Sequence, residues 1–144
     1  MKLLLKLLLL IVLTSNCKKD EKVILDPCSC SEKVICTEVY ISVAVVIKNQ
    51  NGQPVAVDDY YTTRMATGEK MNLKTAESDS LRNIHGKYPI LTDSQRRLTE
   101  KCGTDFEFTG IKNGKEIIKR IYSIGHDCCH VKILKGDTSI IISD

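Results

Sequence analysis

The sequence contains no Trp and only two Phe among its 144 residues. A hydrophobic core must therefore be built mainly from Val, Ile, Leu and Tyr, and β-branched side chains suit the pleated, half-buried surface of a sheet. No apolar run reaches the ~20 residues that a membrane-spanning helix needs. Segments of helix length are also missing between the strand-like segments, which excludes a parallel α/β sheet.

A large net charge is absent as well. Residues 1–16 hold two of the 21 basic residues and none of the 18 acidic ones, so the rest of the chain has 19 basic against 18 acidic residues, a net charge of +1. Nucleic-acid binding needs a clustered basic surface, so we expect no nucleic-acid partner. No G-x-S-x-G nucleophile elbow is present. We therefore expect no catalytic residues and no cofactor.

The first residues, MKLLLKLLLLIVLTSNC, have the layout of a secretory signal peptide. Lys2 and Lys6 precede a short apolar stretch at residues 7–13. The stretch that ends on Cys17 resembles the relaxed lipobox of Bacteroidetes-type lipoproteins, which implies that the thiol carries lipid. We predict that Cys17 anchors the chain to a membrane. The alternative is an ordinary signal peptide in which Cys17 is accidental.

The residues after Cys17 read KKDEK. Lys19, Asp20 and Glu21 resemble the surface-export signal of those lipoproteins. The resemblance implies the outer leaflet of the outer membrane and an outward-facing protein. The alternative is a solvated charged tether without an export role.

Six cysteines remain once Cys17 is lipidated, namely Cys28, Cys30, Cys36, Cys102, Cys128 and Cys129. An even number of cysteines in a small domain of an oxidising compartment indicates a disulfide framework, although 15 pairings are possible. Adjacent cysteines would form a strained ring. We expect bridges from the first three to the last three, with Cys128 and Cys129 taking different partners, one of them around Cys36.

The segment GHDCCH near the end of the chain is a candidate metal site. On a strand, His126, Cys128 and His130 share one face, which we expect to point outward with Cys129 inward, unless a bulge at Gly125 shifts the register. Two imidazoles and a thiolate are zinc ligands. The spacing matches no compact zinc signature, so we favour a disulfide clamp with exposed histidines. Thiol redox catalysis is disfavoured because no C-x-x-C motif is present.

The pattern predicts an all-β fold, a sandwich of seven or eight strands with one short helical insert. Residues 77–86 are polar and predict a loop, whereas the segment after Thr92 and Asp93 predicts one or two helical turns. Asn-Gly pairs predict tight turns. The expected strands cover residues 39–49, 55–65, 70–75, 87–91, 104–112, 115–125, 128–136 and 138–143.

A carboxylate pair and an aromatic pair follow one another in the second expected strand. Asp58 and Asp59 precede Tyr60 and Tyr61, which is a weak signal for a calcium or sugar site. Calcium loops need more ligands and a central glycine. We therefore expect ordinary strand residues, with Asp58 and Tyr60 on one face and the other two on the opposite face.

Three stretches, VAVVIKNQNGQPV, TGEK and GKYPI, resemble the prealbumin-like domain of carboxypeptidase regulatory-like modules. The closing NGKEIIKRIYSIGHDCCHVKILKG is similar to the end of small Bacteroidetes lipoproteins of unknown function with that fold. The resemblance covers residues 39–143 and departs at residues 77–83 and 94–101. It implies a fold and a location but no activity.

The expected organisation is a lipoprotein signal peptide over 1–16, a lipidated tether and Cys-rich segment over 17–38, and one β-sandwich domain over 39–144. The favoured function is a non-catalytic binding or accessory module on the outer membrane, with a protein or glycan ligand. The alternatives are a structural envelope component and a Cys/His metal-binding protein.

Overall fold

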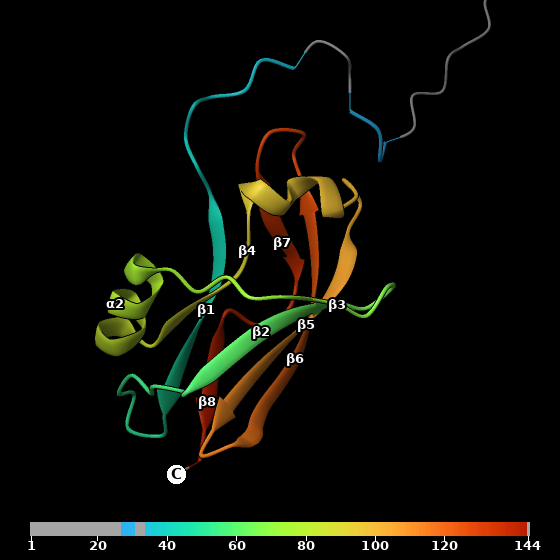
Figure 1. Ribbon diagram of the computed structural model, residues 1–144. Coiled ribbons are helices and arrows are strands. Elements are labelled where there is room, and N and C mark those ends of the chain that lie inside the picture. The colour runs from blue at the N-terminus through green and yellow to red at the C-terminus, as the bar shows by residue number, and fades with distance from the viewer. Residues whose placement is uncertain (1–26, 31–33, 144) are drawn as a thin grey trace, which may run out of the picture.

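The computed structural model describes residues 27–30 and 34–143. The predicted signal peptide, Cys17 and the export-like residues lie outside this range. The described chain forms two sheets packed face to face, which confirms the all-β sandwich (Figure 1). The strands are β1 (Ser42–Asn49), β2 (Asp59–Arg64), β3 (Glu69–Met71), β4 (Lys87–Thr92), β5 (Thr104–Lys112), β6 (Lys115–His126), β7 (Val131–Lys135) and β8 (Ser139–Ile142).

The smaller sheet has the order β4-β1-β8, and the larger has the order β3-β2-β5-β6-β7. β1 pairs antiparallel with β4 and parallel with β8. Pro89 lies in β4, at the edge of the smaller sheet, beside a register irregularity, as a residue without an N–H requires. The β5–β6 hairpin turns at Asn113 and Gly114, whose φ angles of 52° and 70° fit the tight turn that the Asn-Gly pair predicted.

The core consists of the alternate residues that each strand turns toward the opposite sheet. In β1, Val45 and Ile47 are fully buried, and in β5 both Phe106 and Phe108 are fully buried. The rings of Tyr60, Tyr88 and Phe108 pack together with centroids 5.2 to 6.3 Å apart. Clustered aromatic and β-branched side chains thus replace the missing Trp.

The crossing from the smaller to the larger sheet differs from the prediction. Residues 55–58 were expected to begin a strand, but β2 begins only at Asp59. The buried Tyr88 hydroxyl donates to the carbonyl of Val55 and accepts from the N–H of Val57, both at 2.9 Å. The Tyr88 side chain therefore forms the hydrogen bonds that a neighbouring strand would otherwise form with this backbone.

The polar segment predicted as a loop is a helix, α2 (Ala76–His85). The prediction was wrong because local contacts stabilise this helix without a clear apolar stripe. Asp79 and Arg82 form an ion pair of 2.9 Å, and Gly86, with a φ angle of 61°, ends the helix by donating to the carbonyl of Arg82.

The predicted helical insert is the 3-10 helix η1 (Asp93–Leu98), preceded by Thr92 as its N-cap. The described residues therefore contain two helical segments where one was expected. Within the described ranges, neither is long and apolar enough to cross a membrane.

Candidate functional site

The N-terminal segment lies at one end of the sandwich, beside η1 (Figure 1), and disulfides tie it there, so we call this end the disulfide end. It comprises residues 27–30 and 34–41, η1 and the β6–β7 turn at residues 127–130. Each bridge joins an early cysteine to a later one, as the sequence predicted, with Cα atoms 5.1 to 5.7 Å apart. The pairs are Cys28–Cys102, Cys30–Cys128 and Cys36–Cys129.

The two adjacent cysteines lie in a turn and not on a strand, so the predicted facing of their side chains was wrong. Cys128 is buried and has a φ angle of 80°, whereas Cys129 is half-buried. The Asp127 carboxylate accepts from the N–H groups of Cys129 and His130 at 3.0 and 2.8 Å, which lowers its pKa. Asp127 thereby organises the turn that presents both cysteines.

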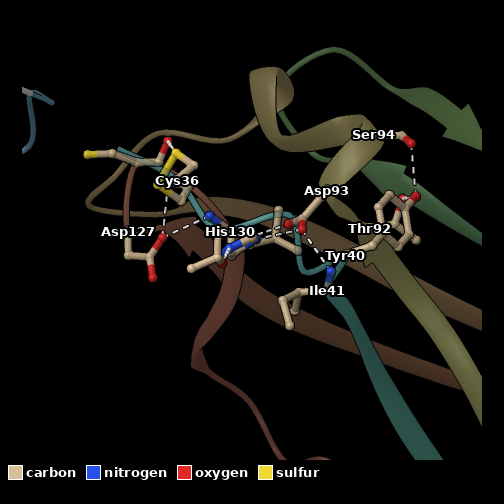
Figure 2. A network of polar contacts seen from close by, with 12 residues as sticks. Cys36, Tyr40, Ile41, Thr92, Asp93, Ser94, Asp127 and His130 are labelled. Atoms are coloured by element: carbon tan, nitrogen blue, oxygen red, sulfur yellow. Dashed lines mark hydrogen bonds and ion pairs between the residues drawn. A yellow bond between two sulfur atoms is a disulfide. The ribbon is translucent and has the colours of Figure 1, made fainter. Parts of the chain in front are cut away.

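Asp93 is the central residue of the polar network in Figure 2. One carboxylate oxygen accepts from the Ile41 N–H at 2.7 Å and contacts His130 Nδ1 at 2.8 Å, and the other accepts from the Val131 N–H at 2.8 Å. Burial alone would raise the pKa of Asp93, but these hydrogen bonds, His130 first, hold it below its usual value. One side chain thus joins η1, the approach to β1 and the start of β7.

The N-terminal segment also contacts η1 and the turn through hydroxyl groups. Tyr40 donates from its phenol to Thr92 Oγ1 at 2.7 Å and lies 2.8 Å from Ser94 Oγ, and these bonds lower its pKa. Thr37 Oγ1 lies 3.0 Å from His130 Nε2. Both ring nitrogens of His130 therefore have protein partners.

His126 is half-buried and does not point into solvent. Its Nδ1 lies 2.9 Å from Thr99 Oγ1 and its Nε2 lies 3.6 Å from the sulfur of Cys30. Burial, with a smaller effect of Arg96, lowers its pKa. The prediction of two exposed histidines was therefore wrong, because both rings connect the N-terminal segment or η1 to β6 and β7.

The structure changes the candidate metal ligands. Potential ligand atoms of Cys30, His126 and Cys128 lie within 4.8 Å of one another, whereas the predicted set with His130 is not brought together among the described residues. The two sulfurs are bonded to each other, and a metal ligand must be a free thiolate. With the Cys30–Cys128 bridge formed, the cluster therefore has a structural role.

A groove at the opposite end of the sandwich was not found by sequence reasoning. We call it the hairpin groove, and it has a volume of about 570 Å³, within the range of binding clefts. One wall is the β5–β6 hairpin and the other is β8. The lining residues are Lys112, Asn113, Lys115, Ile117, Arg120, Ile141, Ile142 and Ser143.

The hairpin groove is electropositive. Among the described residues, Lys112, Lys115 and Arg120 line it, no acidic residue does, and none forms an ion pair with these three cations. In the sequence, the signal for this groove is the segment KEIIKRI, in which cations are interleaved with isoleucines. The sequence does not reveal that this part of β6 stays uncovered, because that depends on where β7 stops pairing.

Asp59, Tyr60 and Tyr61 are ordinary strand residues of β2, as expected, whereas Asp58 lies just before β2 and is exposed, so it does not share a face with the buried Tyr60. Tyr60 is buried, while Tyr61 lies on the outer face, where Lys70 Nζ is 4.4 Å from its ring centroid. Asp59 pairs with Lys74, which lowers the pKa of Asp59. Asp58 accepts from a backbone N–H of the β5–β6 turn, so the two carboxylates have separate partners.

The two ends offer different chemistry. The disulfide end fixes the N-terminal segment with covalent bonds and engaged polar groups, whereas the hairpin groove has cations and isoleucines open to a ligand. No protein-family model, curated protein or solved structure matches the chain.

Proposed function

We propose that the chain is an outer-membrane lipoprotein, exposed at the cell surface, that acts as a non-catalytic binding or accessory module. Lipid on Cys17 anchors it, and the hairpin groove holds the ligand. A prealbumin-like sandwich is a suitable scaffold, because it presents loops and edges from a rigid core.

The placement of the two ends carries this proposal. β5 begins at Thr104, two residues after the bridged Cys102, and ends at Lys112 in the groove. Nine extended residues span roughly 30 Å. Cys28, Cys30 and Cys36 are bridged to one end, so an anchor on that side leaves the hairpin groove facing away from the membrane.

A non-catalytic role is supported by the state of the groups best suited to acid–base work. Both ring nitrogens of His126 and His130 contact structural partners. Asp93 holds three hydrogen bonds with a lowered pKa, so it stays ionised near neutral pH and does not shuttle protons.

Cell fractionation and surface proteolysis test the anchoring. The wild type should partition with the outer membrane, and Cys17→Ala should release the protein from it because the acyl chains are lost. Protease added to intact cells should degrade the wild type. Outer-membrane retention of Cys17→Ala contradicts the anchor, and protection from protease on intact cells contradicts surface exposure.

Metal binding is the second candidate, favoured by the proximity of Cys30, His126 and Cys128. It requires reduction of the Cys30–Cys128 bridge to two thiolates. Zinc analysis of protein purified without chelators, with and without a dithiol reductant, separates the two candidates. One zinc per chain in the reduced protein and none without reductant would favour the metal-binding candidate, whereas no zinc in either state would exclude it.

A further inference from the structure

Two strands leave an edge unpaired beside the hairpin groove. β6 pairs with β7 only from Ser123 to His126, so among the described residues its stretch 115–122 has a partner on one side alone. β8 pairs with β1 on one side, and its other side has no described partner. Figure 1 shows both edges at the end of the molecule that carries the β5–β6 turn. The groove is a gap between two sheet edges.

The β1–β8 ladder shows which backbone groups of β8 face this gap. The Val46 N–H donates to the Thr138 carbonyl at 2.8 Å. In a parallel ladder the bonding residues alternate, so the peptide groups of Ile140 and Ile142 face β1. The N–H and C=O of Ile141 therefore point to the groove. An extended peptide placed there can bond to them.

Apolar side chains flank these backbone groups. Ile141 is 66% exposed and Ile117 is 40% exposed, although both are large hydrophobic residues. They lie on opposite walls of the groove. A strand has side chains on two faces, so one peptide can place apolar residues against both isoleucines.

The charged side chains that line the groove indicate which kind of partner binds there. Lys115 and Arg120 are five residues apart on β6, which corresponds to roughly 16 Å along a strand, and Lys112 lies across the hairpin turn. A second copy docked edge to edge would bring its own three cations against these. An acidic segment of another protein is attracted by them instead.

We propose that the hairpin groove binds an extended acidic peptide segment of a partner protein, which adds as a β-strand along the free edge of β8. Acidic side chains about five residues apart pair with Lys115 and Arg120, and the apolar residues between them cover Ile117 and Ile141. This mode is strand addition, in which backbone bonds supply affinity and side chains supply specificity. It names the ligand class for the binding module and so rests on the proposed function.

Fluorescence anisotropy with the full chain in detergent micelles tests the peptide. The probes are labelled, blocked octapeptides of the pattern Thr-Glu-X-X-Thr-Thr-Glu-Thr, with X as Val, Ile or Leu, so that the two apolar side chains lie on opposite faces of the strand. Saturable binding is expected. A version with Lys in place of both Glu should bind at least tenfold more weakly, and so should a version N-methylated at alternate backbone positions, which lacks the donors for strand pairing.

Three variants locate the site. Lys115→Glu with Arg120→Glu should weaken binding at least tenfold and favour the Lys-containing peptide. Ile141→Pro removes an N–H that faces the groove and the exposed Ile141 side chain, so it should abolish binding while the melting temperature stays close to that of the wild type. Lys132→Glu is the matched control, because Lys132 is exposed on β7 outside the groove, and it should bind as the wild type does.

Equal binding of the N-methylated and unmodified peptides would overturn strand addition, and so would the absence of binding by every octapeptide. Tighter binding of a sulfated or carboxylated oligosaccharide at the same residues would assign the groove to an acidic glycan. Self-association in analytical ultracentrifugation that Ile141→Pro removes would assign it to a second copy. None of these results depends on lipidation or surface exposure, so failure here is distinct from failure of the anchoring experiments.

Discussion

The two ends of the sandwich are stabilised in different ways. At the disulfide end, three covalent bridges and the Asp93 network hold backbone that lies outside the sheets. At the hairpin end, the strand ladders continue to a tight turn, yet two strand edges have no described partner and three cations form no ion pair with the described residues. Polar groups are satisfied at one end and left available at the other.

This difference suggests a division of tasks. Residues 34–40 are all exposed and make few apolar contacts, so the bridges supply what burial does not. An unpaired strand edge, in contrast, can pair with a strand of another molecule. The surrounding lysines make such unwanted pairing less favourable. The residues at the hairpin end contribute little to stability, so their side chains and backbone groups are available to bind a ligand.

Removal of a bridge should have the largest effect. Cys36→Ser combined with Cys129→Ser frees the segment before β1 without leaving a reactive thiol. We expect a loss of about 2–5 kcal/mol in the free energy of unfolding and a fall in melting temperature on the order of 10 °C. Differential scanning calorimetry measures both. A double variant that melts within a degree or two of the wild type would show that the bridge is dispensable.

Loss of the Asp93 charge should come next. Asp93→Asn keeps the shape but turns an amide donor toward a backbone N–H, at a cost of about 2–3 kcal/mol by urea unfolding. Asp105→Asn is the control, because Asp105 is exposed, and it should have almost no effect. Similar losses in the two variants would contradict the role of Asp93.

His130→Ala should cost about 1–2 kcal/mol, because it removes contacts to Asp93 and Thr37. The sequence predicted that His126 and His130 are exposed, and removal of an exposed histidine would change stability little. The hydrogen-bonded position of His130 reverses that expectation. Urea unfolding of His130→Ala and His130→Gln side by side measures the effect. A loss below about 0.5 kcal/mol in both would restore the original view of a dispensable histidine.

Acid should weaken the disulfide end in two steps. The pKa of His126 is lowered in the folded protein from its ordinary 6.5, so the unfolded chain takes up the proton first and stability falls as the pH drops below about 6.5. The pKa of Asp93 is lowered from 3.8, so its stabilisation is complete above about pH 4 and is lost below that. Melting temperatures across this range, repeated with His126→Gln and Asp93→Asn, should show each step reduced in its own variant. An unchanged profile in both would contradict this assignment.

Charge reversal at the hairpin end should have the smallest effect on stability. Lys115→Glu with Arg120→Glu alters exposed side chains that have no described ion-pair partner, so unfolding should change by less than about 0.5 kcal/mol. Urea unfolding of this variant beside Lys132→Glu checks the expectation. A loss as large as that of Asp93→Asn would mean that the groove cations stabilise the fold, and the comparison between the two ends would fail.

Local sequence patterns predicted most of the strands, and the cysteines predicted that bridges join early residues to late ones. The pattern predicted a strand at residues 104–112, which is β5, and the structure buries Phe106 and Phe108 on its inner face. The even count of cysteines, in a chain expected to reach an oxidising compartment, predicted bridges from early to late positions. The helix at residues 76–85 was missed because its polar composition resembles a loop, and the facing of Cys128 was missed because a turn replaced a strand.

The sequence by itself determined the core-facing residues, the tight turns and the supply of cysteines, because each depends on neighbours within a few positions. The tertiary structure decided the rest. Asp93 joins backbone groups from residues 41 and 131, and the groove exists because β7 leaves β6 at Ser123 while β8 joins the other sheet. Contacts between distant segments and the positions of free edges depend on how the sheets pair, and pairing is a property of the whole chain.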